Sequence, residues 1–132
     1  MNQQDIQLIL SRHLGSHLRL PIFIVNLEGD LLYFNEYAER ILGCRFEDMG
    51  PMGEEVWSKV FSFKDEDKFP LKPEEVPLSI ALAKRCSINR RLWLHGMDGF
   101  DRHIETICFP LISKADRVVG GIALFWELHD YR

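Results

Sequence analysis

Apolar residues near the N-terminus recur three or four positions apart, which is the spacing of an amphipathic helix. Gly15 follows the last of them, at the position where glycine often ends a helix. We therefore expect a helix within residues 1–19. If its apolar stripe does not cover the domain's own core, it must meet a second copy of the chain. The stripe consists of Ile6, Ile9, Leu10 and Leu14.

The next segment has the spacing of two strands and a capped helix. Residues 21–27 and 31–34 are rich in β-branched and aromatic residues, and the Glu-Gly-Asp turn between them predicts a hairpin. Asn35 can then accept a backbone N–H at the start of a helix over residues 36–42, and Gly43 ends that helix.

The middle of the chain has two further helical patterns separated by a polar loop. Residues 53–61 place four large apolar residues on one helical stripe. Pro77 suits the first turn of a helix over residues 77–85, because its missing N–H would be unpaired there anyway. The polar, proline-punctuated segment between these helices predicts a loop. The stripe of the first helix is Val56, Trp57, Val60 and Phe61.

Three longer strands follow, over residues 86–96, 100–112 and 117–128. In the first, apolar and polar residues alternate as in a strand with one buried face. The turns between the three are short, so the pattern predicts an antiparallel meander. The pair Gly120-Gly121 allows a bend or a close backbone approach in the last strand.

This order of elements predicts an α+β fold. Strands come in two runs with a run of helices between them, which does not match alternating α/β architecture. The hairpin and the meander would most simply join in one five-stranded antiparallel sheet with the helices packed on one face. A chain of 132 residues and 15.5 kDa has room for one such domain.

Three segments of the chain resemble the PAS family of sensory domains. The hairpin and its capped helix resemble the opening of a PAS domain in "LPIFIVNLEGDLLYFNEYAERILG". The acidic loop and following helix resemble its F-helix region in "DEDKFPLKPEEVPLSIALAKR". The last two strands resemble its closing strands in "DGFDRHIETICFPLISKADRVVGGIALFWEL".

The resemblance implies a PAS domain over residues 20–128, preceded by residues 1–19 as an N-terminal cap helix. Residues 129–132 would then lead toward a downstream domain, since Asp130 resembles the acidic residue of the family's exit motif. Two positions depart from the family's pattern: Asn26 replaces a common aspartate, and Lys68 replaces the usual glycine of the acidic loop.

Composition argues against several other classes. The net charge is -4, and no run of Lys or Arg exceeds two residues, so we expect neither nucleic-acid binding nor attachment to an anionic membrane. No apolar run approaches the length of a bilayer span, and the cytoplasm is the expected location. The three cysteines Cys44, Cys86 and Cys108 are widely spaced and predict neither a disulfide framework nor a zinc site.

The family resemblance raises flavin and haem as cofactors, and the sequence disfavours both. Cys44 stands in "GCRF", but the flavin-adduct cysteine of related light sensors lies one helix later, and the last strand has no Gln or Asn for a flavin's polar edge. The helix over residues 77–85 has no histidine for haem iron, and only His95 and His103 could approach a cavity from the sheet.

Asp101, His103 and Glu105 raise an enzyme as the alternative function. Their spacing of two puts all three on one face of a strand, within reach of a shared metal or a proton relay. The same spacing is typical of a solvated sheet face, which is the simpler interpretation. We therefore expect no catalysis.

The remaining candidate site is an apolar cavity between the helices and the sheet, which would take a small hydrophobic ligand or be filled by its own side chains. Its expected lining is Trp57, Phe61, Leu78, Leu82, Trp93, Ile107 and Phe125.

The sequence thus predicts a PAS-type sensory or regulatory module of signal transduction, of the kind found in two-component or cyclase regulation. It would bind a small ligand or mediate homodimerisation through the N-terminal helix, and control an output domain or partner protein.

Overall fold

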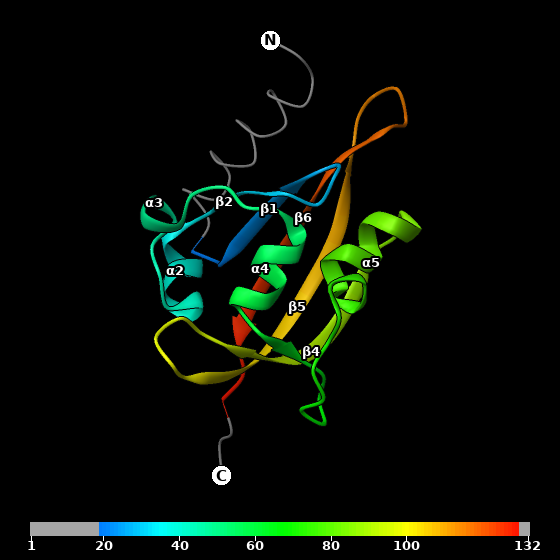
Figure 1. The fold of residues 1–132 in the computed structure, drawn as a ribbon. Helices are drawn as coiled ribbons and strands as arrows, with labels where there is room; N and C mark the ends of the chain where they lie inside the picture. Colours follow the sequence, from blue (N-terminus) through cyan, green and yellow to red (C-terminus); the bar gives the residue numbers. More distant parts are fainter. Residues whose placement is uncertain (1–18, 130–132) are drawn as a thin grey trace.

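Six strands form one antiparallel sheet in the computed structural model, which describes residues 19–129 (Figure 1). Their order across the sheet is β2-β1-β6-β5-β4-β3. In chain order they are β1 (Ile22–Asn26), β2 (Leu31–Phe34), β3 (Phe63–Lys64), β4 (Ile88–His95), β5 (Asp101–Ile112) and β6 (Val118–Glu127). The helices are α2 (Glu36–Leu42), α3 (Phe46–Met49), α4 (Glu54–Val60), the 3-10 helix η1 (Pro73–Glu75) and α5 (Pro77–Lys84).

The α+β fold and the antiparallel sheet expected from the sequence are confirmed, with one correction. The hairpin β1–β2 joins the meander β4–β5–β6 through the pairing of β1 with β6. The expected count of five strands was wrong, because β3 adds a sixth at the edge next to β4. Two residues are too short to show an alternating pattern, so the sequence predicted a loop there.

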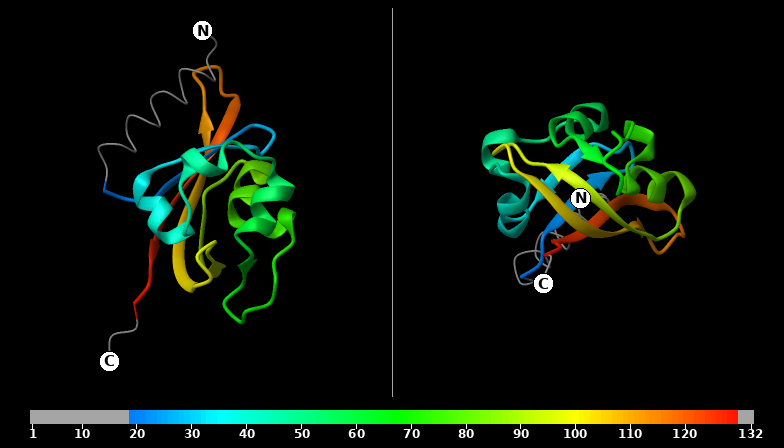
Figure 2. Two further views of the ribbon diagram at one scale, coloured as in Figure 1. Left: turned by 60° about the vertical axis from the view of Figure 1, so that its left-hand side comes forward. Right: turned by 90° about the horizontal axis from the view of Figure 1, so that it is seen from below.

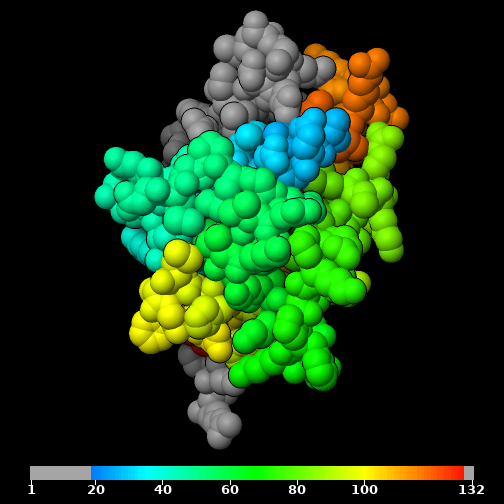
Figure 3. All heavy atoms as spheres, viewed as in Figure 1, coloured from blue at the N-terminus to red at the C-terminus, as the bar shows by residue number. Residues whose placement is uncertain are grey.

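The helices gather on one side of the curved sheet, as the view from below shows (Figure 2). Residues of α2, α4 and α5 pack with the inward-facing residues of the strands in one large core. In the space-filling view, atoms of the helices and their connecting segments cover most of this side of the sheet (Figure 3). We call this side the inner face.

A second, smaller apolar cluster lies on the opposite side of the sheet. Its members all come from strands, and no described helix contributes to it. We call this cluster the outer patch. It consists of the buried Ile22, Ile24 and Ile122 with the partly buried Tyr33, Phe109, Leu111 and Leu124 packed against them.

The close backbone approach predicted at Gly120-Gly121 is present. A Cβ atom at Gly120 would lie 2.5 Å from the carbonyl oxygen of Val25 on the neighbouring strand. A Cβ at Gly121 would lie 3.1 Å from the side chains of Leu78 and Leu82, so this glycine lets α5 pack directly on β6.

One expectation about α4 needs correction. Trp57 and Phe61 are buried as predicted, but Val56 is 52% exposed. The spacing therefore assigned one residue too many, Val56, to the buried side of the helix. The reason is that α4 has only two turns and faces the core along one edge.

The segment predicted as an N-terminal helix lies outside the described residues, and so do Ile6, Ile9, Leu10 and Leu14. Residues 130–132 of the expected exit segment also lie outside them. The division of the chain into residues 1–19, 20–128 and 129–132 therefore stays a prediction. Within residues 19–129, no helix is long and apolar enough to cross a membrane.

Asn35 joins the start of the sheet to the first described helix. Its Oδ1 accepts hydrogen bonds from the backbone N–H of Ala38 in α2, at 3.0 Å, and of Ile22 in β1, also at 3.0 Å. Its Nδ2 donates to the carbonyl of Leu20 at 2.8 Å. The side chain is only 2% exposed. A smaller apolar residue would therefore leave these backbone groups without a hydrogen-bond partner and shielded from water.

We predict that Asn35→Ala lowers the free energy of unfolding by about 2–4 kcal/mol, because it removes a helix N-cap and strands buried polar groups. Urea unfolding followed by circular dichroism measures the change. The control is Asn89→Ala at an exposed position of β4, which should change stability by less than about 0.5 kcal/mol. Equal effects of the two variants would contradict the assigned role of Asn35.

Candidate functional site

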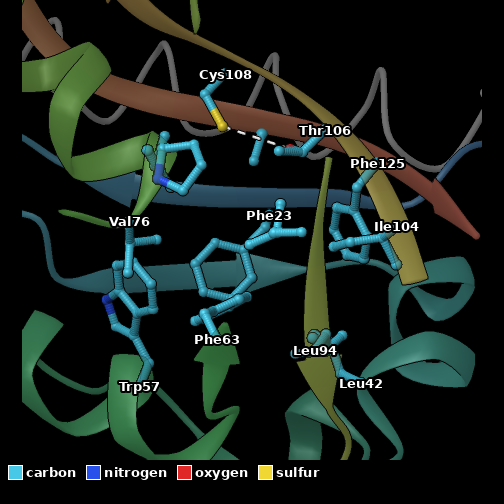
Figure 4. Close-up of a pocket in the computed structure, with 14 residues that line it drawn as sticks. Phe23, Leu42, Trp57, Phe63, Val76, Leu94, Ile104, Thr106, Cys108 and Phe125 are labelled. Atoms are coloured by element: carbon cyan, nitrogen blue, oxygen red, sulfur yellow. Dashed lines mark hydrogen bonds between the residues drawn. The ribbon is translucent and has the colours of Figure 1, made fainter. Parts of the chain in front are cut away.

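A small apolar cavity of about 40 Å³ lies between the inner face of the sheet and α2, α4 and α5. Figure 4 shows the Phe23 ring projecting into the middle of the group, with Trp57 and Phe63 on one side and Phe125 on the other. The wall is formed by Phe23, Leu42, Trp57, Phe63, Val76, Pro77, Leu78, Leu92, Leu94, Ile104, Thr106, Cys108, Ala123 and Phe125.

The structure brings only some of the predicted lining residues to the cavity. Trp57, Leu78 and Phe125 are part of its wall. Phe61 is fully buried in the same core without reaching the wall, and Leu82 packs on the core beside Gly121.

The placement of Trp93 and Ile107 in the cavity was wrong. Both lie on the outer face, because their strand neighbours Leu92, Leu94 and Cys108 point inward and successive side chains alternate between faces. Trp93 stacks on the ring of His103 with the ring centroids 4.6 Å apart.

Sequence reasoning missed several wall residues whose pattern was available. Leu92 and Leu94 are two residues apart on β4, and Ile104, Thr106 and Cys108 continue the same inward face across β5. If the inward face of β4 had been assigned from Leu92 and Leu94 instead of from the large aromatic Trp93, these wall residues would have been predicted.

The cavity wall offers almost no polar group. Thr106 is the polar side chain on it, and its hydroxyl donates to the carbonyl oxygen of Leu124 at 3.1 Å. Among residues 19–129, no buried side-chain nitrogen or oxygen lacks a hydrogen-bond partner. The wall therefore holds no polar side chain that lacks a hydrogen-bond partner.

A large cofactor does not fit this cavity. Pockets for drug-sized ligands measure roughly 300–1,000 Å³, far more than the volume here. A flavin also needs hydrogen bonds along its polar edge, and the single hydroxyl on the wall is already engaged. Neither His95 nor His103 is part of the wall, so neither is placed to bind haem iron inside it.

Cys44 lies outside the cavity, as a half-buried residue directly after the left-handed Gly43 that ends α2. Burial raises the pKa of its thiol to about 11, and the negative charges of Glu39, Asp48 and Asp98 contribute. A thiol with such a pKa stays protonated and unreactive near neutral pH.

Cys108 is on the cavity wall and is also protonated. Its burial raises the pKa of the thiol to about 12, although a hydrogen bond with Thr106 lowers it slightly. Neither of these two cysteines is therefore positioned as a nucleophile.

The three residues of the enzyme alternative lie on one strand face, but each is bound by a different partner. Asp101 Oδ1 lies 2.7 Å from Nδ1 of His95, and this hydrogen bond lowers the pKa of the Asp101 carboxyl. Glu105 Oε1 accepts from Nε of Arg91 at 3.0 Å. His103 pairs through Nε2 with Glu66 of the loop after β3.

These separate pairs do not make a shared site. No group of three His, Cys, Asp or Glu side chains within residues 19–129 is arranged to hold a metal ion. The pairs instead fix the outer face, where Lys68 also lies over the Trp93 ring at 4.3 Å and holds the loop after β3 against β4.

Comparisons with known proteins identify the fold. No protein-family model matches the chain, and no curated protein matches it. Among solved structures, the PAS domain of the fruit-fly ELK potassium channel is 11% identical, with a TM-score of 0.68 over 93% of this chain and 96% of that one.

Two further matches have the same architecture. The PAS domain of nitrogen regulation protein NR(II) from Vibrio parahaemolyticus is 14% identical, with a TM-score of 0.62 over 90% of this chain and 98% of that one. A light-oxygen-voltage domain studied with a flavin analogue is 13% identical, with a TM-score of 0.66 over 98% and 90% of the two chains. Identities this low establish the fold and carry no information about activity.

The raised thiol pKa values predict a loss of stability in alkaline solution. In the unfolded chain these thiols ionise near their ordinary pKa of 9.0, whereas in the folded protein Cys44 and Cys108 keep their protons up to about 11 and 12. The unfolded state therefore binds fewer protons above pH 9, and the free energy of unfolding falls as pH rises, by up to about 1.4 kcal/mol per pH unit for each thiol.

Urea unfolding between pH 8 and about pH 10.5 measures this slope. The variants Cys44→Ala and Cys108→Ala should each remove part of it, whatever their stability at pH 8. A slope that stays unchanged in the double variant would show that these thiols ionise equally in both states.

Proposed function

Because the chain has the PAS fold, we propose that it is a sensory or regulatory module of signal transduction that controls an output domain or a partner protein. The observation that carries the proposal is the small apolar cavity in the core between the helices and the sheet. Such a site can respond to a small apolar ligand or to changes in packing, and it offers no group for chemistry on a substrate. We propose that the module acts without catalysis of its own.

The geometry supports a role for β6 in passing a change outward. Phe125 faces the cavity, whereas its neighbour Trp126 faces the other side of the sheet, next to the strand's end at Glu127. A shift of the Phe125 ring would displace the β6 backbone and with it Trp126. Residues 129–132 follow directly, and we propose that they carry the change to an output domain of two-component or cyclase type.

Two further features belong to the proposal. The module forms a homodimer through the helix of residues 1–19, with Ile6, Ile9, Leu10 and Leu14 at the interface. It works in the cytoplasm. The acidic net charge and the absence of basic runs in the sequence argue against attachment to nucleic acid or to an anionic membrane.

We predict that the purified full-length chain is colourless and that native mass spectrometry finds the polypeptide mass without a flavin or haem. The reason is the size and polarity of the cavity. Supplying excess flavin or haem during expression should not change this result. A visible flavin or haem band that survives gel filtration would overturn this part of the proposal.

We predict that xenon, a probe of dry apolar cavities, binds in the cavity and shifts the NMR signals of the Phe125 ring and of the Trp126 indole. Ala123→Val narrows the cavity and should abolish both shifts, because Ala123 is on the wall. The matched control Ala115→Val, in an exposed turn, should leave them unchanged. Shifts at Phe125 without any at Trp126 would contradict transmission through β6.

A further inference from the structure

Strand β4 has an outer edge that is only partly paired. Strand β3 pairs with it at two positions near its C-terminal end, and no other element within residues 19–129 pairs with this edge. The pairing ends at Asp65, whose backbone N–H donates to the carbonyl of Phe69 and whose carboxylate accepts from the Phe69 N–H. The chain thereby turns away from β4. Residues 88–92 are left as an open edge, about 17 Å long.

The backbone of this open edge keeps hydrogen-bonding groups free. The N–H of His95 donates to the carbonyl of Phe61 at 3.1 Å, so His95 points to the side of β4 on which β3 lies. Backbone groups of alternate residues in a strand point to the same side. Because β4 pairs with β5 without a register shift, Asn89 and Arg91 also point to this side. Each presents one N–H and one C=O, and no backbone group within residues 19–129 bonds to them.

The open edge lies in a basic part of an acidic chain. Residues 76–97 contain four cations and no Asp or Glu, although the whole chain has a net charge of -4. Arg90 and Arg91 are exposed, and their side chains leave the strand on opposite faces. Arg91 is paired with Glu105, whereas the only hydrogen bond of the Arg90 side chain in the described part of the chain is a 3.5 Å contact with the carbonyl of Asn89. The four cations are Lys84, Arg85, Arg90 and Arg91.

These features favour an extended acidic peptide over a second copy of the chain. In strand addition, main-chain hydrogen bonds hold an extended peptide on a sheet edge and side chains give specificity. Two β4 edges paired with each other would bring together Arg90 and Arg91 of both copies, and like charges on opposed strands are destabilising. Carboxylates on an added strand would instead form charge-assisted hydrogen bonds with these guanidinium groups.

We propose that the open edge of β4 binds an extended, acidic segment of a partner protein as an added strand. The N–H and C=O groups of Asn89 and Arg91 form the backbone hydrogen bonds, and Arg90 selects acidic side chains. None of these three residues is on the cavity wall. The inference therefore does not rest on the proposed sensory function.

Amide hydrogen exchange, measured by NMR on the full chain, tests the proposal. The probe is a blocked seven-residue peptide in which threonine and glutamate alternate. We expect saturating peptide to slow the exchange of the Asn89 and Arg91 amides at least about tenfold. The same peptide with lysine in place of glutamate should not slow it. Unchanged exchange with the glutamate peptide at millimolar concentration would overturn the proposal.

Two substitutions separate the backbone contact from the charge. Asn89→Pro removes an N–H that points to the open edge and not to β5, so the sheet should be retained and peptide binding lost. The matched Asn89→Ala keeps this N–H and should bind like the native chain. Arg90→Glu should reverse the preference and bind the lysine peptide better. Equal binding by both Asn89 variants, or an unchanged preference in Arg90→Glu, would contradict the proposal.

The indole signal of Trp57, which is buried in the core, reports the folding of each variant. If Asn89→Pro does not fold, the charge reversal at Arg90 still decides, because an exposed arginine is replaced there and the edge N–H groups are kept.

Exchange in the free protein shows whether another segment already occupies the edge. Slow exchange of the Asn89 and Arg91 amides that depends on protein concentration would assign the edge to a second copy. Slow exchange at every concentration would assign it to residues of the same chain outside 19–129. Either result would overturn the proposal. Because the xenon measurement reports on the cavity, a failure here and a failure of the proposed sensory function give different results.

Discussion

The packing of Phe23 at the centre of the inner face determines how much space the fold leaves. Its ring stacks parallel to Phe34 of β2 at a centroid distance of 6.1 Å, and meets the edge of Trp57 at 5.1 Å. It also contacts Phe61 at 6.3 Å. Strand β1 thereby fixes both its hairpin partner and the helix α4. On the neighbouring strand the directly opposed residue is the small Ala123, and the remaining cavity opens there.

The cavity's chemistry follows from the same packing. Large aromatic rings fill the end of the inner face near α4. Apart from the Phe125 ring, the wall residues on β5 and β6 are small or branched, and Thr106 is the one with a hydroxyl. Such a site would select a ligand by its shape and volume and not by hydrogen bonds. The charged side chains lie elsewhere, in pairs such as Arg102 with Asp98, where the hydrogen bond from Arg102 lowers the pKa of the Asp98 carboxyl to about 2.

Much of the fold could be predicted because local signals and tertiary packing agree. Asn35 caps α2 and Gly43 ends it in the left-handed conformation, as the sequence indicates. The inward faces of β4 and β5 were harder to assign. Ile107 and Trp93 are apolar but outward-facing, because the outer side of this sheet is itself partly apolar, so hydrophobicity alone does not identify the buried face. Strand β3 and the loop after it depend on contacts with β4 and β5 that no local pattern encodes.

The two apolar faces give β6 a special position in the fold. Its residues alternate between the core of the inner face, through Ala123 and Phe125, and the outer patch, through Ile122 and Leu124. A change in packing on one face therefore reaches the other through a single strand, without any rearrangement of hydrogen bonds across the sheet. Helix α5 also packs directly on this strand, because the missing side chain of Gly121 lets Leu78 and Leu82 contact the β6 backbone. The packing on the two faces of the sheet is thus separated by the backbone of a single strand, and residues of β6 belong to both apolar clusters.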